Sequence, residues 1–178
     1  KGPGIDLFRK IQQALGWKEV IAEDLGMMTD TVRQLVKDSG YPNMKVLGFA
    51  FDPTGTSEHL PHNYEKNCVC YTGTHDNETL MQMYDGMDKK TLAFTTDYLN
   101  NAHSTREEIK WDFIRLAMLS VADTCIVPIQ DYLGLGQEAR MNFPSTTGNN
   151  WKWRVGKADL TRQLAKEILH LTKLSSRL

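Results

Sequence analysis

The sequence predicts an α/β protein built as half of a (β/α)8 barrel. Four short apolar runs lie along the chain, and each ends in acidic or amide residues. Amphipathic helical patterns separate most of these runs, which is typical of a parallel sheet covered by helices on its outer side. Polar residues just past the carboxyl ends of such strands are characteristic of the active face of a barrel. Because a complete barrel has eight strands, four runs predict half of one.

The first part of the chain predicts a helix followed by a strand. Residues 5–15 place apolar side chains four positions apart, and Gly16 follows them. This pattern predicts a helix that ends at the glycine. The apolar run 20–22 predicts the first strand, and Glu23 and Asp24 follow it directly.

A second helix and a second strand come next. The helix is expected between Thr29, a typical N-cap residue, and Gly40, which favours the left-handed conformation that ends helices. The second strand, residues 45–51, ends at Asp52. Residues 53–67 are rich in Pro, Gly, Asn and His and predict no helix.

The third strand is predicted at residues 68–71, and it leads into the Thr-His-Asp-Asn sequence of residues 74–77. Two helical patterns follow this strand. The stronger one opens with a capping-box sequence from Ser104 to Glu107 and carries a buried apolar side.

The fourth strand is predicted at residues 125–129 and ends at Gln130 and Asp131. Pro128 fits this strand imperfectly, because proline removes a backbone donor from the sheet. The last helix is expected over about residues 159–174. Its buried face is predicted to consist of Leu160, Leu164, Ile168 and Leu171.

Composition limits the classes of partner. The 178 residues are 40% hydrophobic and 24% charged, which is ordinary for a globular protein, and they predict a single segment, 1–178, without an internal boundary. The formal net charge of −1 contains no block of like charge, so neither a nucleic-acid nor a membrane partner is expected and a neutral substrate fits better. No apolar stretch approaches the ~18–20 residues of a membrane-spanning helix.

The cysteines predict a reducing compartment and raise one metal hypothesis. The chain has three cysteines, and an odd number of thiols favours the cytoplasm. His59, His62, Cys68 and Cys70 could be drawn as metal ligands. The two cysteines lie within an apolar strand rather than on a zinc-type knuckle, so buried thiols near loop histidines are preferred. Neither a metal nor a cofactor is predicted.

The acids at the strand ends indicate the chemistry. In a barrel, Glu23, Asp24, Asp52, Asp76 and Asp131 would converge on one mouth. A pair of carboxyl groups cleaves glycosidic bonds when one stays protonated for the leaving oxygen and the other stays anionic beside the oxocarbenium-like transition state. Strand-end acids also serve as helix caps, so spacing alone leaves both interpretations open.

Four motifs resemble the 4-α-glucanotransferases, the amylomaltases or disproportionating enzymes of glycoside hydrolase family 77. VIAEDLG (20–26) and YPNMKVLGFAFD (41–52) are similar to that family's fifth and sixth barrel strands. YTGTHDNET (71–79) resembles the seventh strand, and the segment from PIQDYLG to NWKWR (128–154) resembles the eighth strand and the residues after it. The resemblance covers about residues 1–154 and implies the C-terminal half of a catalytic TIM barrel, strands 5 to 8 with their helices.

The resemblance implies an activity and a substrate. The intact protein is expected to transfer maltosyl or longer segments between α-1,4-glucans, such as maltooligosaccharides, starch or glycogen, by a retaining double displacement. Glu23 matches the general acid/base, which needs a pKa raised by burial and neighbouring acids. Asp76 matches the carboxylate that grips the donor sugar and stabilises the transition state. A plastid location remains open beside the cytoplasmic one.

Four further residues are assigned to substrate binding through the same motifs. His75 matches a hydrogen-bond donor to the donor sugar, and Asn77 follows in the same motif. Phe49 matches an aromatic residue on the acceptor side, and Asn142 matches another substrate-side position. Trp151 is left out, because it could simply pack the last segment onto the barrel.

Each assignment has a structural alternative. The polar residues 76–77 could cap a helix that begins at Glu78. Glu23 could be the buried ion-pair partner of Arg140. Phe49 could belong to the core, since alternate strand residues point toward the helices.

The nucleophile is expected to be missing. In the family it follows the fourth strand, before the point at which these residues begin, so the 178 residues are expected to be inactive alone and to self-associate through exposed sheet edges. Two rivals remain: a hydrolase of the α-amylase clan, and a non-catalytic glucan-binding half-barrel.

Overall fold

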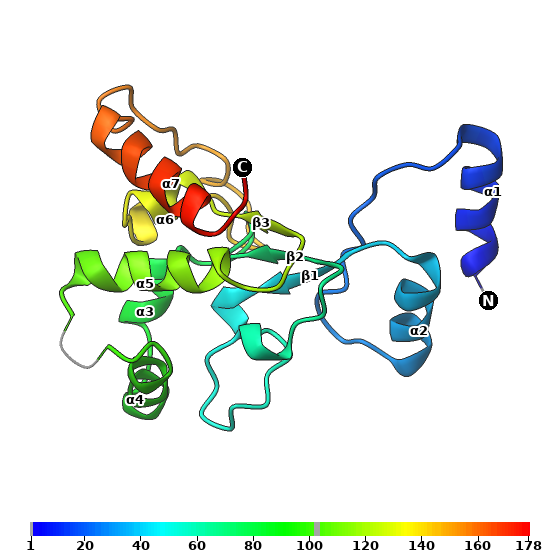
Figure 1. Ribbon diagram of the computed structural model, residues 1–178, viewed down its shortest axis with the longest axis horizontal. Coiled ribbons are helices and arrows are strands. Elements are labelled where there is room, and N and C mark those ends of the chain that lie inside the picture. The colour runs from blue at the N-terminus through cyan, green and yellow to red at the C-terminus, as the bar shows by residue number, and fades with distance from the viewer. Residues whose placement is uncertain (1, 102–103) are drawn as a thin grey trace.

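A three-stranded parallel sheet forms the centre of the protein (Figure 1). The computed structural model describes residues 2–101 and 104–178. The strands are β1 (Asn43–Val46), β2 (Cys68–Tyr71) and β3 (Thr124–Ile126), and their order in the sheet is their order in the chain. Both pairs of neighbours are parallel, as the sequence predicts. The described residues therefore form a mixed α/β structure in which the carboxyl ends of the strands meet at one edge of the sheet.

The predicted first strand is wrong. Residues 20–22 form only an isolated parallel bridge, between Ala22 and Asn43, in which the Ala22 amide donates to the carbonyl of Pro42 at 2.9 Å. The bridge nevertheless places Ala22 beside the start of β1, so this segment extends the sheet on that side. Ile21, however, is 43% exposed, so little burial stabilises a strand at this edge.

The other strands are confirmed, but two of them end earlier than predicted. After β1 the chain turns into a short 3-10 helix, η1 (Leu47–Phe49), and the Gly48 amide still donates to the carbonyl of Thr72 at 3.0 Å. β3 ends at Ile126, and Pro128 is the N-cap of the short helix α6 (Ile129–Tyr132). Proline is well tolerated at a helix start, since the first amides of a helix have no partner within it. Only β2 has the predicted bounds.

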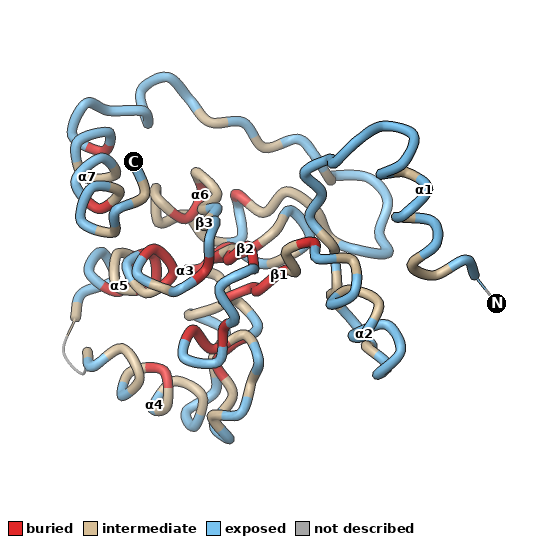
Figure 2. The backbone as a smooth tube through the Cα atoms, turned by 45° about the vertical axis from the view of Figure 1, so that its right-hand side comes forward, coloured by how far each residue is buried: buried red, intermediate tan, exposed pale blue. Residues whose placement is uncertain are grey.

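The first two helices are confirmed. α1 (Ile5–Leu15) has the predicted bounds, and α2 (Asp30–Ser39) lies between the Thr29 N-cap and Gly40, whose φ is 71°. Neither helix contains a buried residue. Both lie away from the sheet and the C-terminal helices, and their surfaces are exposed or half-buried (Figures 1 and 2). The apolar side of α1 is covered only in part, where the ring of Phe8 meets the ring of Tyr41 at a centroid distance of 5.6 Å.

The remaining helices lie on the other side of the sheet from α1 and α2 (Figure 1). They are α3 (Leu80–Asp85), α4 (Lys89–Tyr98), α5 (Arg106–Met118) and α7 (Arg162–Leu174). The capping box exists one residue later than predicted, between Thr105 and Glu108. The core gathers around α5, where Phe113, Ile114 and Ala117 are fully buried. Figure 2 shows the buried residues concentrated in the sheet and in the helices around α5.

The predicted face of the last helix is partly wrong. Leu164 and Leu171 are buried, but Leu160 is 53% exposed and precedes the helix, which begins at Arg162 after the Thr161 N-cap. The Thr161 hydroxyl accepts from the Leu164 amide at 3.0 Å and so fixes the start. Among the described helices, none has the length and apolar character needed to cross a bilayer.

Candidate active site

The loop that carries Glu23 is fixed on both sides. Ala22 bridges to β1, and the carboxylate of Asp24 accepts hydrogen bonds from the Met44 amide at 2.9 Å and from the Asn43 side chain at 3.1 Å. Glu23 itself is exposed, so the burial expected for a general acid is absent from the described residues. The alternative in which Glu23 pairs with Arg140 is wrong, because Arg140 pairs with Glu78 at 3.5 Å.

The turn after β2 presents His75 and Asp76 at its tip. The Asn77 side-chain oxygen accepts from the amide of Thr74 at 2.8 Å and from its hydroxyl at 2.7 Å, which closes the turn. Asn77 thus has a structural role, and only its amide N–H groups remain for a substrate. Helix α3 begins at Leu80 and is capped by Thr79. The helix-cap alternative for residues 76–77 is therefore wrong.

Asp76 is held by two side chains. Oδ1 accepts from Nδ2 of Asn142 at 2.6 Å, and Nε2 of His75 lies 3.4 Å from the same oxygen. The ring of Trp151 faces His75 at a centroid distance of 5.1 Å and an angle of 38°. Trp151, which the sequence reasoning left out, therefore contacts a candidate site residue. Its backbone φ of 64° is unusual for a bulky residue and marks the tight loop that brings it there.

One cavity brings most of the candidate residues together. It has a volume of about 650 Å³ and lies at the carboxyl ends of the strands. Five of the six predicted site residues line it: Glu23, Phe49, His75, Asp76 and Asn77. Its other walls include apolar side chains, namely Ile21, Leu25, Met44, Tyr71, Ile126 and Pro128. The sixth residue, Asn142, reaches this group through its hydrogen bond to Asp76.

Phe49 belongs to this cavity and not to the core. Its side chain is 50% exposed, and its ring meets the ring of His59 edge-on at 5.6 Å. The core alternative for Phe49 is therefore wrong. The turn of η1 after Val46 explains the difference, because it takes Phe49 out of the alternation of the strand.

The other three strand-end acids have structural partners. Asp24 binds β1, and Oδ1 of Asp52 accepts from the Thr54 amide at 2.8 Å in a local turn. Asp131 is buried, and its carboxylate accepts from the hydroxyl of Thr72 at 2.6 Å and from the amide of Leu80 at 2.8 Å. Burial raises the pKa of Asp131 to about 6. Of the five strand-end acids, Glu23 and Asp76 are the two that line the larger cavity.

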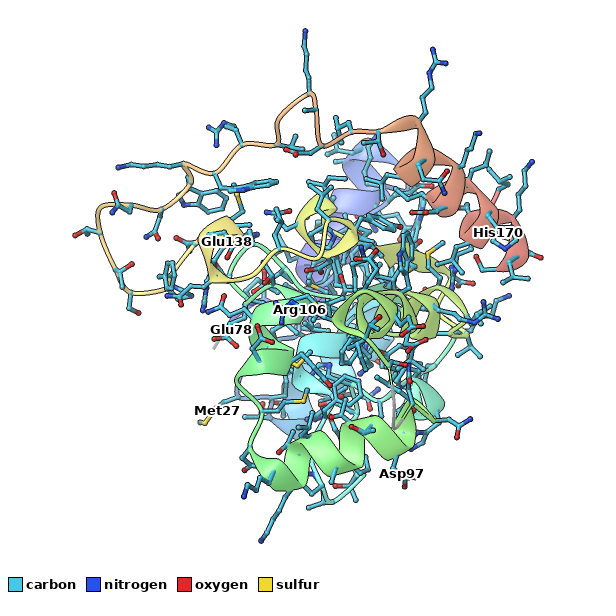
Figure 3. The ribbon with its side chains drawn as sticks, turned by 90° about the vertical axis from the view of Figure 1, so that its left-hand side faces the viewer. Met27, Glu78, Asp97, Arg106, Glu138 and His170 are labelled. Atoms are coloured by element: carbon cyan, nitrogen blue, oxygen red, sulfur yellow. The ribbon has the colours of Figure 1, made fainter. Side chains whose placement is uncertain are left out.

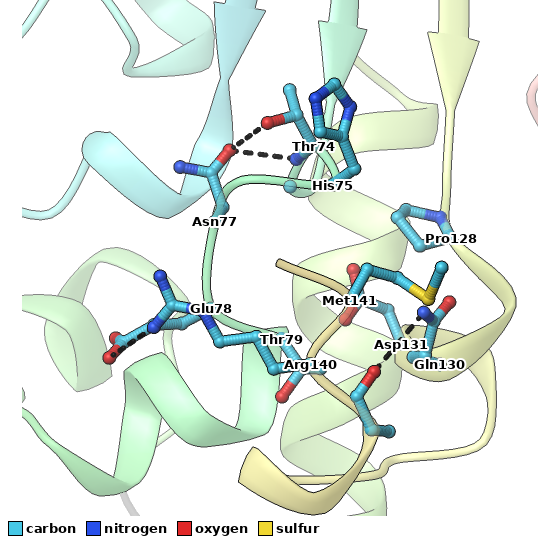
Figure 4. A pocket seen from close by; sticks show the side chains of 12 residues that line it. Thr74, His75, Asn77, Glu78, Thr79, Pro128, Gln130, Asp131, Arg140 and Met141 are labelled. Carbon is cyan, nitrogen blue, oxygen red and sulfur yellow. Dashed lines mark hydrogen bonds and ion pairs between the residues drawn. The ribbon is translucent and has the colours of Figure 1, made fainter. Parts of the chain in front are cut away.

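A smaller cavity of about 230 Å³ lies behind the turn of residues 74–77 (Figure 4). Arg140 and Met141 form one wall, and Asp131 lies next to Gln130 from α6. The carboxylate of Asp131 connects three elements here, since it bonds to Thr72 after β2 and to the start of α3. The turn that carries Asp76 is therefore supported from behind.

The metal hypothesis gains no support from the described residues. Residues 2–101 and 104–178 contain no group of three or more metal-ligating side chains placed to hold an ion. His59 Nδ1 accepts from the Val46 amide at 3.1 Å, and His62 Nδ1 lies 2.8 Å from the hydroxyl of Tyr98. Burial lowers the pKa of His59, which favours the neutral ring that this hydrogen bond needs. Cys68 and Cys70 are buried free thiols.

Two carboxylates around one cavity at the carboxyl ends of parallel strands are an arrangement found in enzymes that act on glycosidic bonds. Comparison with known proteins is more specific. The family described as 4-alpha-glucanotransferase, glycoside hydrolase family 77, matches residues 1–160. The chain therefore belongs to the 4-alpha-glucanotransferases of family 77.

Characterised relatives agree with this family. A 4-alpha-glucanotransferase from Clostridium butyricum is 43% identical over 99% of this chain and 36% of its own length. The chloroplastic/amyloplastic 4-alpha-glucanotransferase of Solanum tuberosum is 47% identical over 86% of this chain and 26% of its own length. The described chain thus spans about a third of the length of the relatives that it matches.

Solved structures match the fold. The amylomaltase from Streptococcus agalactiae in complex with acarbose superposes with a TM-score of 0.92 at 34% identity, over 98% of this chain and 35% of that one. The amylomaltase from Corynebacterium glutamicum matches with a TM-score of 0.63 at 16% identity, over 88% of this chain and 28% of that one. The second match supports the fold alone.

Proposed function

We propose that these residues form strands 5 to 8 of a family 77 barrel whose intact protein transfers maltosyl or longer segments between α-1,4-glucans. The observation that carries the proposal is the placement of Glu23 and Asp76 around one cavity, each at the end of its own sheet segment. The family match and the similarity to the Streptococcus agalactiae amylomaltase support the same proposal.

In the proposed reaction, Glu23 donates a proton to the leaving O4 and later removes one from the incoming sugar hydroxyl. Asp76 stays anionic, binds hydroxyls of the donor sugar and stabilises positive charge in the transition state. His75 orients the same sugar from its place beside Asp76, and Asn142 holds the carboxylate through a hydrogen bond to Oδ1. The exposed Glu23 would acquire the required burial from bound glucan and from the upstream half of the barrel.

Glucan binding is proposed to involve the aromatic wall of the cavity. Phe49 offers an apolar face on which an acceptor sugar can lie, and the amide N–H groups of Asn77 can donate to sugar hydroxyls. Because a related amylomaltase structure contains acarbose, acarbose is a suitable probe for this cavity.

A retaining double displacement also needs a nucleophile. Asp24, Asp52 and Asp131 bind neighbouring groups of the protein, so none of them can take this role beside Glu23. We therefore expect the 178 residues alone to lack transfer activity. Joined to the upstream half of a family 77 barrel, they should convert maltotriose into glucose and longer maltodextrins.

This complementation experiment separates the rivals. The upstream half is supplied in cis, or in trans as a separate chain, and the Glu23→Gln variant of the joined protein serves as the control. Longer maltodextrins support transfer, whereas only glucose and maltose would indicate a hydrolase of the α-amylase clan. A joined protein that binds acarbose without turnover would indicate a non-catalytic glucan-binding module. Strong activity from the 178 residues alone would contradict the assignment of the site.

Exposed apolar residues also favour association of the chain assayed alone. Leu7 and Leu15 on α1, and Trp17 and Val20 in the segment after it, are each at least 40% exposed. We propose that the upstream half of the barrel covers this side and that its absence leads to self-association. Light scattering should detect oligomers of the 178 residues and a monomer of the joined protein.

The cellular compartment is proposed to be the cytoplasm or a plastid. The plastid is kept as an alternative because the relative from Solanum tuberosum is described as chloroplastic/amyloplastic.

A further inference from the structure

Arg140 makes contacts on every edge of its guanidinium group. Nε donates to the carbonyl of Asn142 at 3.0 Å, and Nη2 donates to the carbonyl of Asp76 at 3.0 Å. Nη1 lies 3.5 Å from a carboxylate oxygen of Glu78, and the group stacks on the ring of Phe143 at 4.4 Å. The side chain is only 14% exposed. A planar cation bound on three edges and one face has little freedom to move.

These contacts join the two segments that hold the candidate carboxylate. Arg140 binds the backbone of Asp76 directly, and it binds the backbone of Asn142, whose side chain donates to the carboxylate of Asp76. The main chain and the carboxylate of Asp76 are therefore both fixed relative to one guanidinium group. The turn is also held by the hydrogen bond from the Thr74 amide to the Asn77 side chain. Asp131 supports it from behind by accepting from the amide of Leu80.

Arg140 does not reach the larger cavity. It lines the smaller one behind the turn, together with Glu78 and Asp131 (Figure 4), and it is not among the described residues that line the cavity of Glu23 and Asp76. Its guanidinium group therefore makes its contacts with the protein and is absent from the described walls of the cavity proposed to hold a sugar. We propose that Arg140 is a positioning residue, which sets the turnover rate by holding Asp76 and Asn142 in register. The inference rests on the proposed function of the site.

The test uses the joined protein with Arg140→Met and Arg140→Lys. Arg140→Met removes all three donors but keeps an extended apolar chain on Phe143, and we expect kcat for maltotriose to fall about 100-fold because misplacement by about 1 Å has that effect. KM should change less than about threefold, since the cavity walls are intact. Arg140→Lys keeps the charge and one donor, so an intermediate loss of about tenfold is expected. Arg33→Met is the matched control, because Arg33 is half exposed and pairs with Glu58 away from the cavity.

Amide hydrogen exchange gives a readout that does not depend on activity. Exchange in a peptide that covers residues 73–78 should rise at least about tenfold in Arg140→Met, whereas Arg33→Met should match the unmodified protein. Two outcomes for Arg140→Met would overturn the inference. One is unchanged exchange in this peptide, and the other is faster exchange together with an unchanged kcat. If Arg140→Met does not fold, the same criteria apply to Arg140→Lys. If the unmodified joined protein shows no transfer, the proposed function fails, while the exchange data still decide whether Arg140 holds the turn.

Discussion

Asn142 donates a hydrogen bond from Nδ2 to Oδ1 of Asp76 at 2.6 Å, across 66 residues of sequence. This bond joins the segment after α6 to the turn after β2. It fixes one oxygen of the carboxylate that we assign to the transition state. The strength of an amide-to-carboxylate bond makes it a clear target for mutation.

Asn142→Asp should make activity of the joined protein depend on pH. Two carboxyl groups within hydrogen-bonding distance cannot both ionise easily, so one pKa rises and the pair shares a proton at low pH. We expect a loss of about 10–100-fold above neutral pH, corresponding to roughly 1–3 kcal/mol, with recovery as pH falls. Asn142→Ala is the control and should lose activity without this pH dependence. Parallel pH profiles for the two variants would contradict the assigned contact.

Glu23→Gln tests the acid/base role. Loss of a general acid/base typically lowers the rate by about 10²–10⁴-fold, and we expect this effect on transfer from maltotriose in the joined protein. α-Maltosyl fluoride needs no protonation of its leaving group, and azide is an acceptor without a proton to remove. Together they should restore most of the rate. If the variant stays equally slow with both reagents, Glu23 has another role.

Phe49 and Phe51 form a matched pair two residues apart. Phe51 is 9% exposed and packs on Phe113 at 5.1 Å, so Phe51→Ala should lower the free energy of unfolding by about 3–5 kcal/mol. Phe49 is 50% exposed in the cavity, so Phe49→Ala should change stability little and weaken acarbose binding by several-fold. Thermal unfolding and calorimetric titration measure the two effects. Unchanged acarbose binding in Phe49→Ala would remove this residue from the site.

Asp131 should make the stability of the fold depend on pH. Its pKa in the folded state is about 6, above the ordinary value of 3.8, so the folded state binds the proton more tightly than the unfolded state. Stability should therefore fall as pH rises from about 4 to about 6, by about 3 kcal/mol for this group, and the loss should persist at pH 7. Asp131→Asn carries no charge, and its oxygen can still accept from the Leu80 amide while its NH2 group donates to the Thr72 hydroxyl, which reverses that bond. In urea unfolding, the variant should lose this dependence of stability on pH and be at least as stable as the unmodified protein at pH 7. If the dependence is unchanged in the variant, Asp131 is not its source.

Arg177 should stabilise the end of α7 against α5. Its guanidinium donates to the carbonyl oxygens of Met118, Ser120 and Ala122 at 2.7, 3.0 and 2.9 Å. Arg177→Ala leaves these acceptors without their partner and should cost about 1–3 kcal/mol, visible as a lower Tm. Arg9→Ala is the control, because Arg9 forms only an exposed ion pair with Asp6. Equal Tm values for the two variants would contradict this role.

One large apolar side chain near the site is exposed to solvent. Met27, in the loop after Glu23, is fully exposed and projects away from the body of the chain (Figure 3). Under the proposed function, the upstream half of the barrel would cover this side chain.

Local patterns predicted α1, α2 and β2 well because caps and apolar periodicity act over a few residues. Thr29 and Gly40 mark the ends of α2, and the apolar run 68–71 became β2 unchanged. The errors arose where the packing of the whole chain opposed the structure that the local pattern predicts. Pro128 starts a helix rather than continuing a strand, and residues 20–22 bridge β1 without forming a strand, because one edge contact provides little burial.

The sequence by itself determined the parallel α/β architecture, the family motifs and the set of strand-end acids, since each of these depends on residue type and short spacing. Only the tertiary structure decided which of these acids line the cavity. Asp24, Asp52 and Asp131 bond to neighbouring groups of the protein, while Glu23 and Asp76 face one cavity. The motif resemblance had already singled out Asn142, but only the structure showed the contacts of Asn142 and Arg140 with Asp76. Hydrogen bonds between residues more than 60 positions apart depend on how the chain packs and leave no local pattern.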